Sequence, residues 1–162
     1  SWFYEVVDNG YKYNMTDIAA SIGIHQLKKA IKFQEMREEV TTQYNNAFEE
    51  LPILTPFVSE PKDMHSWHLY IIQLDLDKLT ITRDQFIEIM ADNGIGTSVH
   101  YIPLHMHKYW KENYQLRDSD FPISSKVFSR IVSLPNFPSI TNTELEKIIS
   151  TVTEILTNNR KC

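Results

Sequence analysis

The chain has 162 residues, of which 42% are hydrophobic and 23% are charged, and its 16 basic and 21 acidic residues give a net charge of −5. This composition is typical of a soluble globular protein, and the acidic balance without a Lys/Arg run disfavours a nucleic-acid surface. No apolar run approaches the ~20 residues that span a bilayer, and the single cysteine, Cys162, fits a reducing compartment, so we expect a cytoplasmic protein without membrane or nucleic-acid partners.

A long amphipathic helix is predicted for residues 16–51. Apolar residues recur every three or four positions from Ile18 to Leu51, which is the spacing that lines one face of a helix. Thr16 is the expected N-cap, and Asp17 suits the positive end of the helix dipole. Residues 1–15 begin with aromatic side chains and without an initiator methionine, so we expect the chain to be a fragment of a longer protein.

Residues 52–162 are predicted to form a small sheet covered by helices, an α/β or α+β arrangement. Capping boxes and short runs of strand formers mark the elements. In chain order we expect a strand over 68–75, a helix from the Thr82 capping box to Gly94, a strand over 96–101, a short helix over 124–130, a strand over 131–134 and a final helix from the Thr141 capping box.

The residue types that most often carry chemistry form no decisive motif. His100, His105 and His107 could supply imidazole ligands, but their spacing matches no known zinc signature, so no metal site is predicted. Ser98 and His100 share one face of a predicted strand without a nucleophile elbow, which disfavours a hydrolytic triad. The four glycines form no phosphate-binding loop.

Four segments in a fixed order resemble the DegT-type aminotransferases, a family of fold-type I enzymes that use pyridoxal phosphate and act on keto-sugar nucleotides. The resemblance extends from about Gly10 to Leu156, nearly the whole chain. The segments that carry it are Gly10–Ala20, Ser66–Tyr70, Arg83–Tyr101 with Pro103–His105, and Ser133–Pro138.

The resemblance implies that the chain is the C-terminal portion of such an enzyme. Residues 1–15 would be a residual loop from the large cofactor domain, residues 16–51 a long connecting helix, and residues 52–162 a small domain whose mainly antiparallel sheet is covered by helices. The lysine that bonds the cofactor and the aspartate that pairs with its ring nitrogen are expected upstream. No catalytic residue is therefore predicted within this chain, and we expect it to be inactive alone.

For the parent protein, the resemblance implies a homodimeric transaminase. It would transfer an amino group, commonly supplied by glutamate, to a keto-sugar nucleotide in cell-surface polysaccharide or amino-sugar biosynthesis. Asn14 matches an asparagine that reaches the cofactor phosphate of the partner subunit, although an asparagine that closes a turn would look the same in sequence. His100, Tyr101 and His105 match positions that border the substrate pocket, whereas Trp67 is expected to pack.

Two other functions are also compatible with the sequence. A ligand-binding or regulatory module without catalysis would also lack the cofactor lysine. A sugar dehydratase homologue would carry a histidine in place of that lysine, and the upstream sequence would decide between them.

Overall fold

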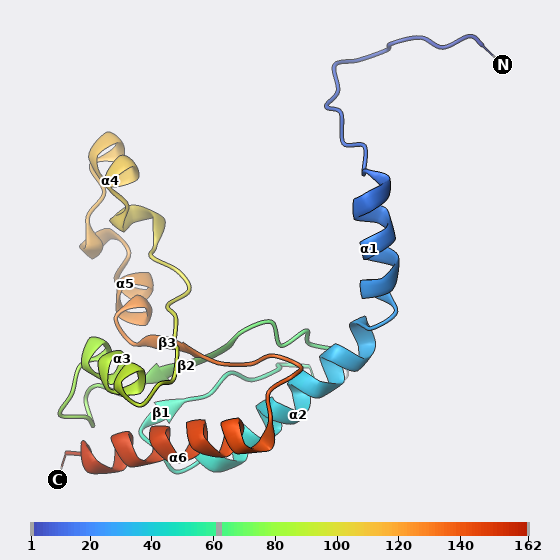
Figure 1. Ribbon diagram of the computed structural model, residues 1–162. Helices are drawn as coiled ribbons and strands as arrows, with labels where there is room; N and C mark the ends of the chain where they lie inside the picture. The colour runs from blue at the N-terminus through green and yellow to red at the C-terminus, as the bar shows by residue number, and fades with distance from the viewer. Residues whose placement is uncertain (1, 61–62, 162) are drawn as a thin grey trace. The chain divides into compact units, whose positions relative to one another are not determined.

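The computed structural model (Figure 1) describes residues 2–60 and 63–161. The chain divides into two compact units, and the boundary lies between Lys32 and Phe33. The helix that contains this boundary is α2 (Ala30–Phe48). In the described part of the chain, no helix combines the length and the apolar character that crossing a membrane requires.

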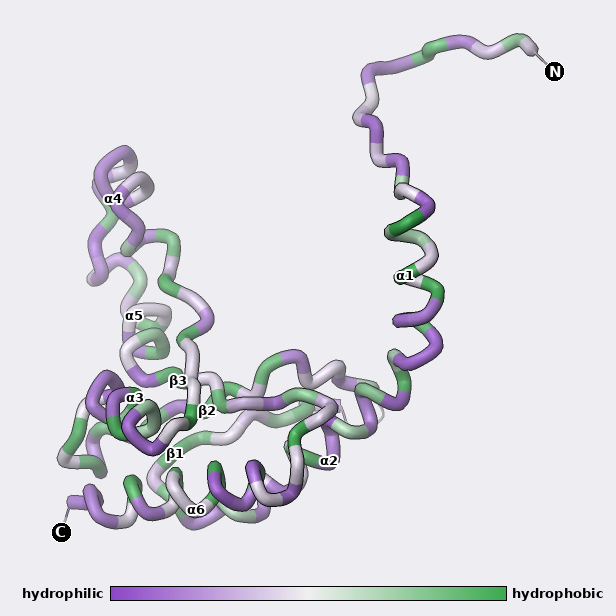
Figure 2. The backbone as a smooth tube through the Cα atoms, viewed as in Figure 1, coloured by the Kyte–Doolittle hydropathy of each residue, from purple (hydrophilic) through white to green (hydrophobic). Residues whose placement is uncertain are grey.

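The first unit consists of an extended segment followed by α1 (Asp17–Leu27). Thr16 is the N-cap, as predicted, because its Oγ1 accepts a hydrogen bond from the backbone N–H of Ala19 at 3.3 Å. None of the residues of α1 is buried. Figure 2 shows hydrophobic and hydrophilic residues mixed along this helix, so its apolar side chains have no core to pack into within the unit.

The single helix predicted over 16–51 is interrupted, and that part of the prediction was wrong. A turn at Lys28 and Lys29 separates α1 from α2. The backbone N–H of Lys29 donates to the carbonyl of Gln26 at 3.0 Å, a bond over three residues that tightens the chain locally and interrupts the regular helical ladder. The C-terminal end of the predicted helix also differs, because α2 ends at Phe48 and not at residue 51.

A three-stranded antiparallel sheet forms the centre of the second unit, in the order β1-β2-β3. The predicted antiparallel character is confirmed, and the two strands predicted over 68–75 and 131–134 are present. Ile71 of the middle strand pairs with Ser133 of the third. The strands are β1 (Ile53–Leu54), which the sequence did not predict, β2 (Tyr70–Leu74) and β3 (Ile131–Leu134).

The strand predicted over 96–101 does not form, which corrects the sequence interpretation. Instead, Ser98 makes an isolated antiparallel bridge to Ser133 of β3. The two residues exchange both backbone hydrogen bonds, at 3.2 and 2.7 Å. Pairing stops soon afterwards because Pro103 has no N–H to donate and the 3-10 helix η1 (Leu104–Met106) begins at the next residue.

The helix signals of the second unit are largely confirmed. Thr82 and Thr141 both form complete capping boxes with the residues three positions later, and Gly94 ends its helix with a φ of +72°, in the left-handed region. Besides η1, the helical elements after β2 are α3 (Arg83–Asp92), α4 (Lys108–Tyr114), the 3-10 helix η2 (Asp118–Asp120), α5 (Pro122–Phe128) and α6 (Asn142–Asn158).

The core lies between one face of the sheet and the helices α2, α3 and α6. Alternate residues of a strand point to the same face, and Tyr70, Ile72 and Leu74 of β2 are all buried. They share one apolar cluster with residues of the three helices, and α2 and α6 run side by side (Figure 1). The helical members of this cluster are Val40, Tyr44, Phe48, Phe86, Met90, Leu145, Ile148, Val152, Ile155 and Leu156.

The capping box of α6 is expected to make stability depend on acid pH. The Glu144 carboxylate accepts hydrogen bonds from the backbone N–H and the hydroxyl of Thr141, at 2.8 and 2.7 Å. These bonds hold the pKa of Glu144 below its usual value. A carboxyl group whose pKa is lowered in the folded state stabilises the fold above its unfolded pKa, and this stabilisation is lost as the pH falls through the folded pKa.

Glu144→Gln keeps an oxygen that can accept but removes the titrating charge. We therefore expect the free energy of unfolding of the variant to fall less steeply than that of the unmodified chain between about pH 5 and about pH 3. Urea unfolding at a series of pH values measures this slope. Glu146→Gln, on the exposed side of the same helix, is the matched control and should keep the original slope; an unchanged slope in Glu144→Gln would contradict the prediction.

Candidate functional site

The segment that contains His100 is fixed against β3 by both main-chain and side-chain bonds. Ser98 pairs with Ser133 through the backbone. Two residues later, the Nδ1 atom of His100 lies 2.8 Å from the Oγ atom of Ser133. Ser133 is buried, and His100 is half-buried, so the imidazole is held against β3 while the residue stays partly open to solvent.

Tyr101 follows directly and has a different environment. Its side chain is 72% exposed. The rings of His100 and Tyr101 meet edge to face, with their centroids 4.8 Å apart. The phenol is therefore available to a ligand, and the histidine ring limits its orientation.

His105 is the most deeply buried of the predicted substrate residues. It stands in η1 and is 4% exposed. Its ring stacks on that of Phe121 with a centroid distance of 4.6 Å. The Nε2 atom lies 3.0 Å from the Oγ atom of Ser125, whose hydroxyl donates to the carbonyl of Asp118 at 3.2 Å.

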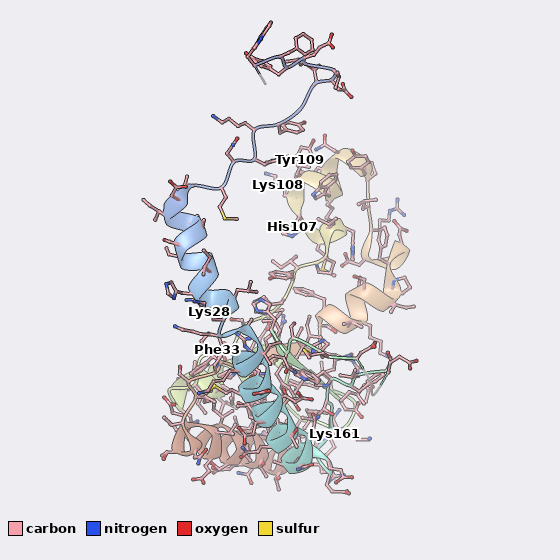
Figure 3. All side chains as sticks on the ribbon, turned by 90° about the vertical axis from the view of Figure 1, so that its right-hand side faces the viewer. Lys28, Phe33, His107, Lys108, Tyr109 and Lys161 are labelled. Carbon is pink, nitrogen blue, oxygen red and sulfur yellow. The ribbon has the colours of Figure 1, made fainter. Side chains whose placement is uncertain are left out.

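An aromatic hollow lies next to His105 and has a volume of about 600 Å³. A second stacked pair, Trp110 and Tyr114 of α4, contributes to its wall with ring centroids 5.6 Å apart. Figure 3 shows His107, Lys108 and Tyr109 where the chain passes from η1 into α4. The lining residues are Pro103, Leu104, His105, Trp110, Tyr114, Leu116, Phe121 and Ser124.

Asn14 lies in the other unit, on the extended segment before α1. Its side chain is exposed, and within residues 2–60 and 63–161 no hydrogen bond to its amide is found. The turn-closing role considered from the sequence is therefore not observed, because Thr16 alone caps the helix. The second unit brings His100, Tyr101 and His105 onto neighbouring segments, whereas Asn14 belongs to a separate unit.

The exit from β3 is held by a group of buried polar contacts. The Tyr44 hydroxyl donates to the carbonyl of Pro135 at 2.9 Å, and burial, with a smaller effect of neighbouring Tyr70, raises the pKa of Tyr44 well above its ordinary value. The Asn136 amide donates to Thr41 Oγ1 at 3.2 Å and to the carbonyl of Trp67 at 3.3 Å. Trp67 is itself buried, in line with its expected packing.

The serines that support the histidines were not predicted from the sequence. Ser133 was part of a family-like segment, but nothing in its neighbours indicates a bond to a residue 33 positions away. The same holds for Ser125. The aromatic residues of α4 were visible in the sequence as a cluster over 109–114, and this signal could have indicated the hollow. Among the residues that the structure describes, no group of three His, Cys, Asp or Glu side chains is arranged to hold a metal ion.

Comparison with protein families gives one match over most of the chain. The model of the DegT/DnrJ/EryC1/StrS aminotransferase family matches residues 1–153. An uncharacterized protein of Methanocaldococcus jannaschii is 44% identical over 161 residues, which are 99% of this chain and 42% of that protein. The spore coat polysaccharide biosynthesis protein SpsC of Bacillus subtilis is 40% identical over 158 residues, 96% of this chain and 40% of that protein.

Solved structures give the same result for the fold. A putative sugar aminotransferase from Streptococcus pneumoniae, in its PMP form, matches with a TM-score of 0.84 and 28% identity over 97% of this chain and 39% of that one. The Helicobacter pylori aminotransferase PseC, involved in the biosynthesis of pseudoaminic acid, matches with a TM-score of 0.80 and 25% identity over 98% of this chain and 42% of that one. The chain thus spans about two fifths of the length of the relatives that it matches.

Proposed function

This chain belongs to the DegT/DnrJ/EryC1/StrS aminotransferase family, and from this premise we propose that it is the C-terminal part of a pyridoxal-phosphate-dependent sugar aminotransferase. The parent enzyme would transfer an amino group from glutamate to the ketone of a nucleotide-linked sugar. Residues 1–15 would continue from the large domain, residues 16–51 would connect the domains, and residues 52–162 would form the small domain. The observation that carries the proposal is the placing of His100 against β3, with Tyr101 beside its ring, and of His105 in the wall of the hollow, all in the second unit.

The aromatic hollow supports a nucleotide-linked substrate in particular. Stacked rings such as Trp110 with Tyr114 and His105 with Phe121 offer flat apolar faces, and a nucleobase stacks on such faces. Tyr101 precedes Pro103, the first lining residue, by two positions. The base would lie in the hollow, and the sugar would lie near His100 and Tyr101. The name of SpsC supports a role in cell-surface polysaccharide synthesis.

Asn14 fits the proposed cofactor. When bound, pyridoxal phosphate supplies the electron sink on which amino-group transfer depends. The Asn14 amide is exposed, on an extended segment, and such an amide can donate to a phosphate oxygen. We propose that it does so in the partner subunit, so that the active enzyme is a two-fold symmetric homodimer.

The bond to the cofactor would come from a lysine outside this chain. Among the lysines of this chain, Lys12 is the nearest in sequence to the position at which the family has its lysine. It nevertheless follows that position, so it does not correspond to the family's lysine. We therefore propose that the 162-residue chain binds no cofactor covalently and is inactive alone. A lysine in the corresponding upstream position of the parent would favour transamination over the dehydratase alternative.

Amino transfer by the full-length parent protein tests this proposal. With glutamate, pyridoxal phosphate and a UDP-linked keto-sugar, we expect an amino-sugar nucleotide that mass spectrometry detects, and no product from the 162-residue chain. His100→Ala should lower kcat/KM by about tenfold to a hundredfold, because a substrate oxygen left without its hydrogen-bond donor in the closed site costs about 1–3 kcal/mol. His68→Ala, a change at an exposed histidine that was given no substrate role, is the control and should have little effect.

Product formation by the 162-residue chain alone would overturn the proposed inactivity. No transfer to any UDP- or dTDP-linked keto-sugar by a folded, cofactor-loaded parent would contradict the proposed reaction. An equal effect of His68→Ala and His100→Ala would argue against a specific substrate role for His100.

A further inference from the structure

Three histidines stand close together in the sequence between residues 100 and 107, and their hydrogen-bond partners distinguish their roles. We infer that Ser133 is a positioning residue: it fixes the neutral His100 ring in the tautomer that carries its proton on Nε2, so that His100 presents an N–H donor to an oxygen of the substrate. The substrate part of this inference rests on the proposed function. The tautomer itself follows from the protein's own contacts.

Ser133 is held rigidly enough to impose an orientation. It is 5% exposed and lies inside β3, where its backbone pairs with Ile71 on one side and Ser98 on the other. A residue paired on both sides has little backbone freedom, and only the rotation of its side chain remains. The distance of 2.8 Å from its Oγ to His100 Nδ1 is that of a good hydrogen bond.

The direction of that bond follows from the available protons. A neutral imidazole has one N–H and one lone pair, and a serine hydroxyl has one proton to donate. Among the residues that the structure describes, His100 Nδ1 is the only partner found for the Ser133 hydroxyl. If Nδ1 carried the proton, the buried hydroxyl proton would have no acceptor, which is unfavourable because a buried donor left unpaired loses its hydration without compensation. Ser133 therefore donates to Nδ1, and the ring proton stands on Nε2.

His105 also contacts a serine, but the hydrogen bond runs in the opposite direction. The Ser125 hydroxyl gives its proton to the carbonyl of Asp118, so its oxygen must accept from His105 Nε2. The N–H of the neutral His105 is therefore directed at the protein. His107 Nε2 lies 3.1 Å from the carbonyl of Ile102, and a carbonyl can only accept.

The three rings thus differ in what they can offer to a ligand. The N–H groups of His105 and His107 donate to acceptors within the protein, namely the Ser125 hydroxyl oxygen and the Ile102 carbonyl. Within the described residues no partner is found for His100 Nε2, so its N–H stays available. A phosphate or sugar oxygen is the complementary group. His100 would then bind substrate as a donor, and it would not act as the base that removes a proton.

Nitrogen-15 NMR of the histidine rings in the 162-residue chain tests the tautomer directly. With the imidazole ring neutral, we expect long-range correlations that show a protonated Nε2 and an unprotonated Nδ1. Ser133→Ala should change this to a mixture of both tautomers, and Ser133→Thr, which restores a hydroxyl, should recover the original pattern. Ser125→Ala is the matched control, since it should perturb His105 and leave His100 unchanged.

A proton on Nδ1 of His100 in the unmodified chain would overturn the inference without any variant. A protonated Nε2 that persists unchanged in Ser133→Ala would also overturn it, because Ser133 would then not set the tautomer. If association of the chain broadens the signals, the same spectra can be recorded with Ile18 and Ile22 replaced by lysine, since both residues lie in the other unit. These outcomes do not depend on amino transfer, so they separate a failure of this inference from a failure of the proposed function.

Discussion

Phe86→Ala is expected to lower the free energy of unfolding by about 3–5 kcal/mol, a large part of the stability of a domain of this size. Phe86 is the fourth residue of α3 and is 0% exposed. It belongs to the cluster in which α3 and α6 pack with the sheet. Removing the ring gives up its burial and leaves a cavity that neighbouring side chains from several elements can fill only in part.

Urea unfolding followed by circular dichroism measures this loss. Phe57→Ala is the matched control, because Phe57 is 83% exposed and its truncation should change the free energy of unfolding by no more than about 0.5 kcal/mol. Similar values for the two variants would show that the second unit does not unfold around the core described above. If Phe86→Ala is unfolded without urea, Phe86→Leu leaves a smaller cavity and should still be measurably destabilised.

Self-association of the 162-residue chain is the second large effect that we expect. Ile18 and Ile22 lie one helical turn apart on α1 and are 76% and 58% exposed. The segment before the helix adds Trp2, Phe3 and Tyr4, which are also exposed. Apolar surface of this extent is usually covered in a soluble protein. In the absence of its natural cover, other copies of the chain should occupy it.

Light scattering at increasing concentration should show an apparent mass that rises above that of the monomer. Ile18→Lys with Ile22→Lys should lower this mass at a given concentration, because two charges on the same face oppose burial. Lys28→Glu with Lys29→Glu, a charge change at the turn after α1, is the comparison for non-specific charge effects. A monodisperse monomer that binds no hydrophobic dye would contradict the expectation.

The sequence predicted those features that depend on neighbouring residues. The two capping boxes and the left-handed Gly94 are local geometries, since each is completed within about one helical turn. The strands β2 and β3 were found for a related reason, because short runs of strand formers between polar residues have few alternatives. The resemblance that indicated the family was likewise carried by short ordered segments.

The features that the sequence missed depend on partners that are distant along the chain. The segment 96–101 has strand-forming residues, yet only Ser98 pairs, because the path after Pro103 leads away from β3. The interruption at Lys28 has no glycine or proline to mark it. The hollow beside His105 requires η1, α4 and the segment around Phe121 to meet, which periodicity within one element cannot indicate.

The sequence by itself determined the family, the order of most elements and the residue types of the candidate site, because helix caps, strand runs and ordered motifs are encoded by adjacent residues. Only the tertiary structure decided how those residues are presented. A histidine ring has two nitrogen atoms, and the one that carries the proton depends on a neighbour such as Ser133 or Ser125. These neighbours lie 33 and 20 positions away along the chain, and they come into contact only when the chain folds.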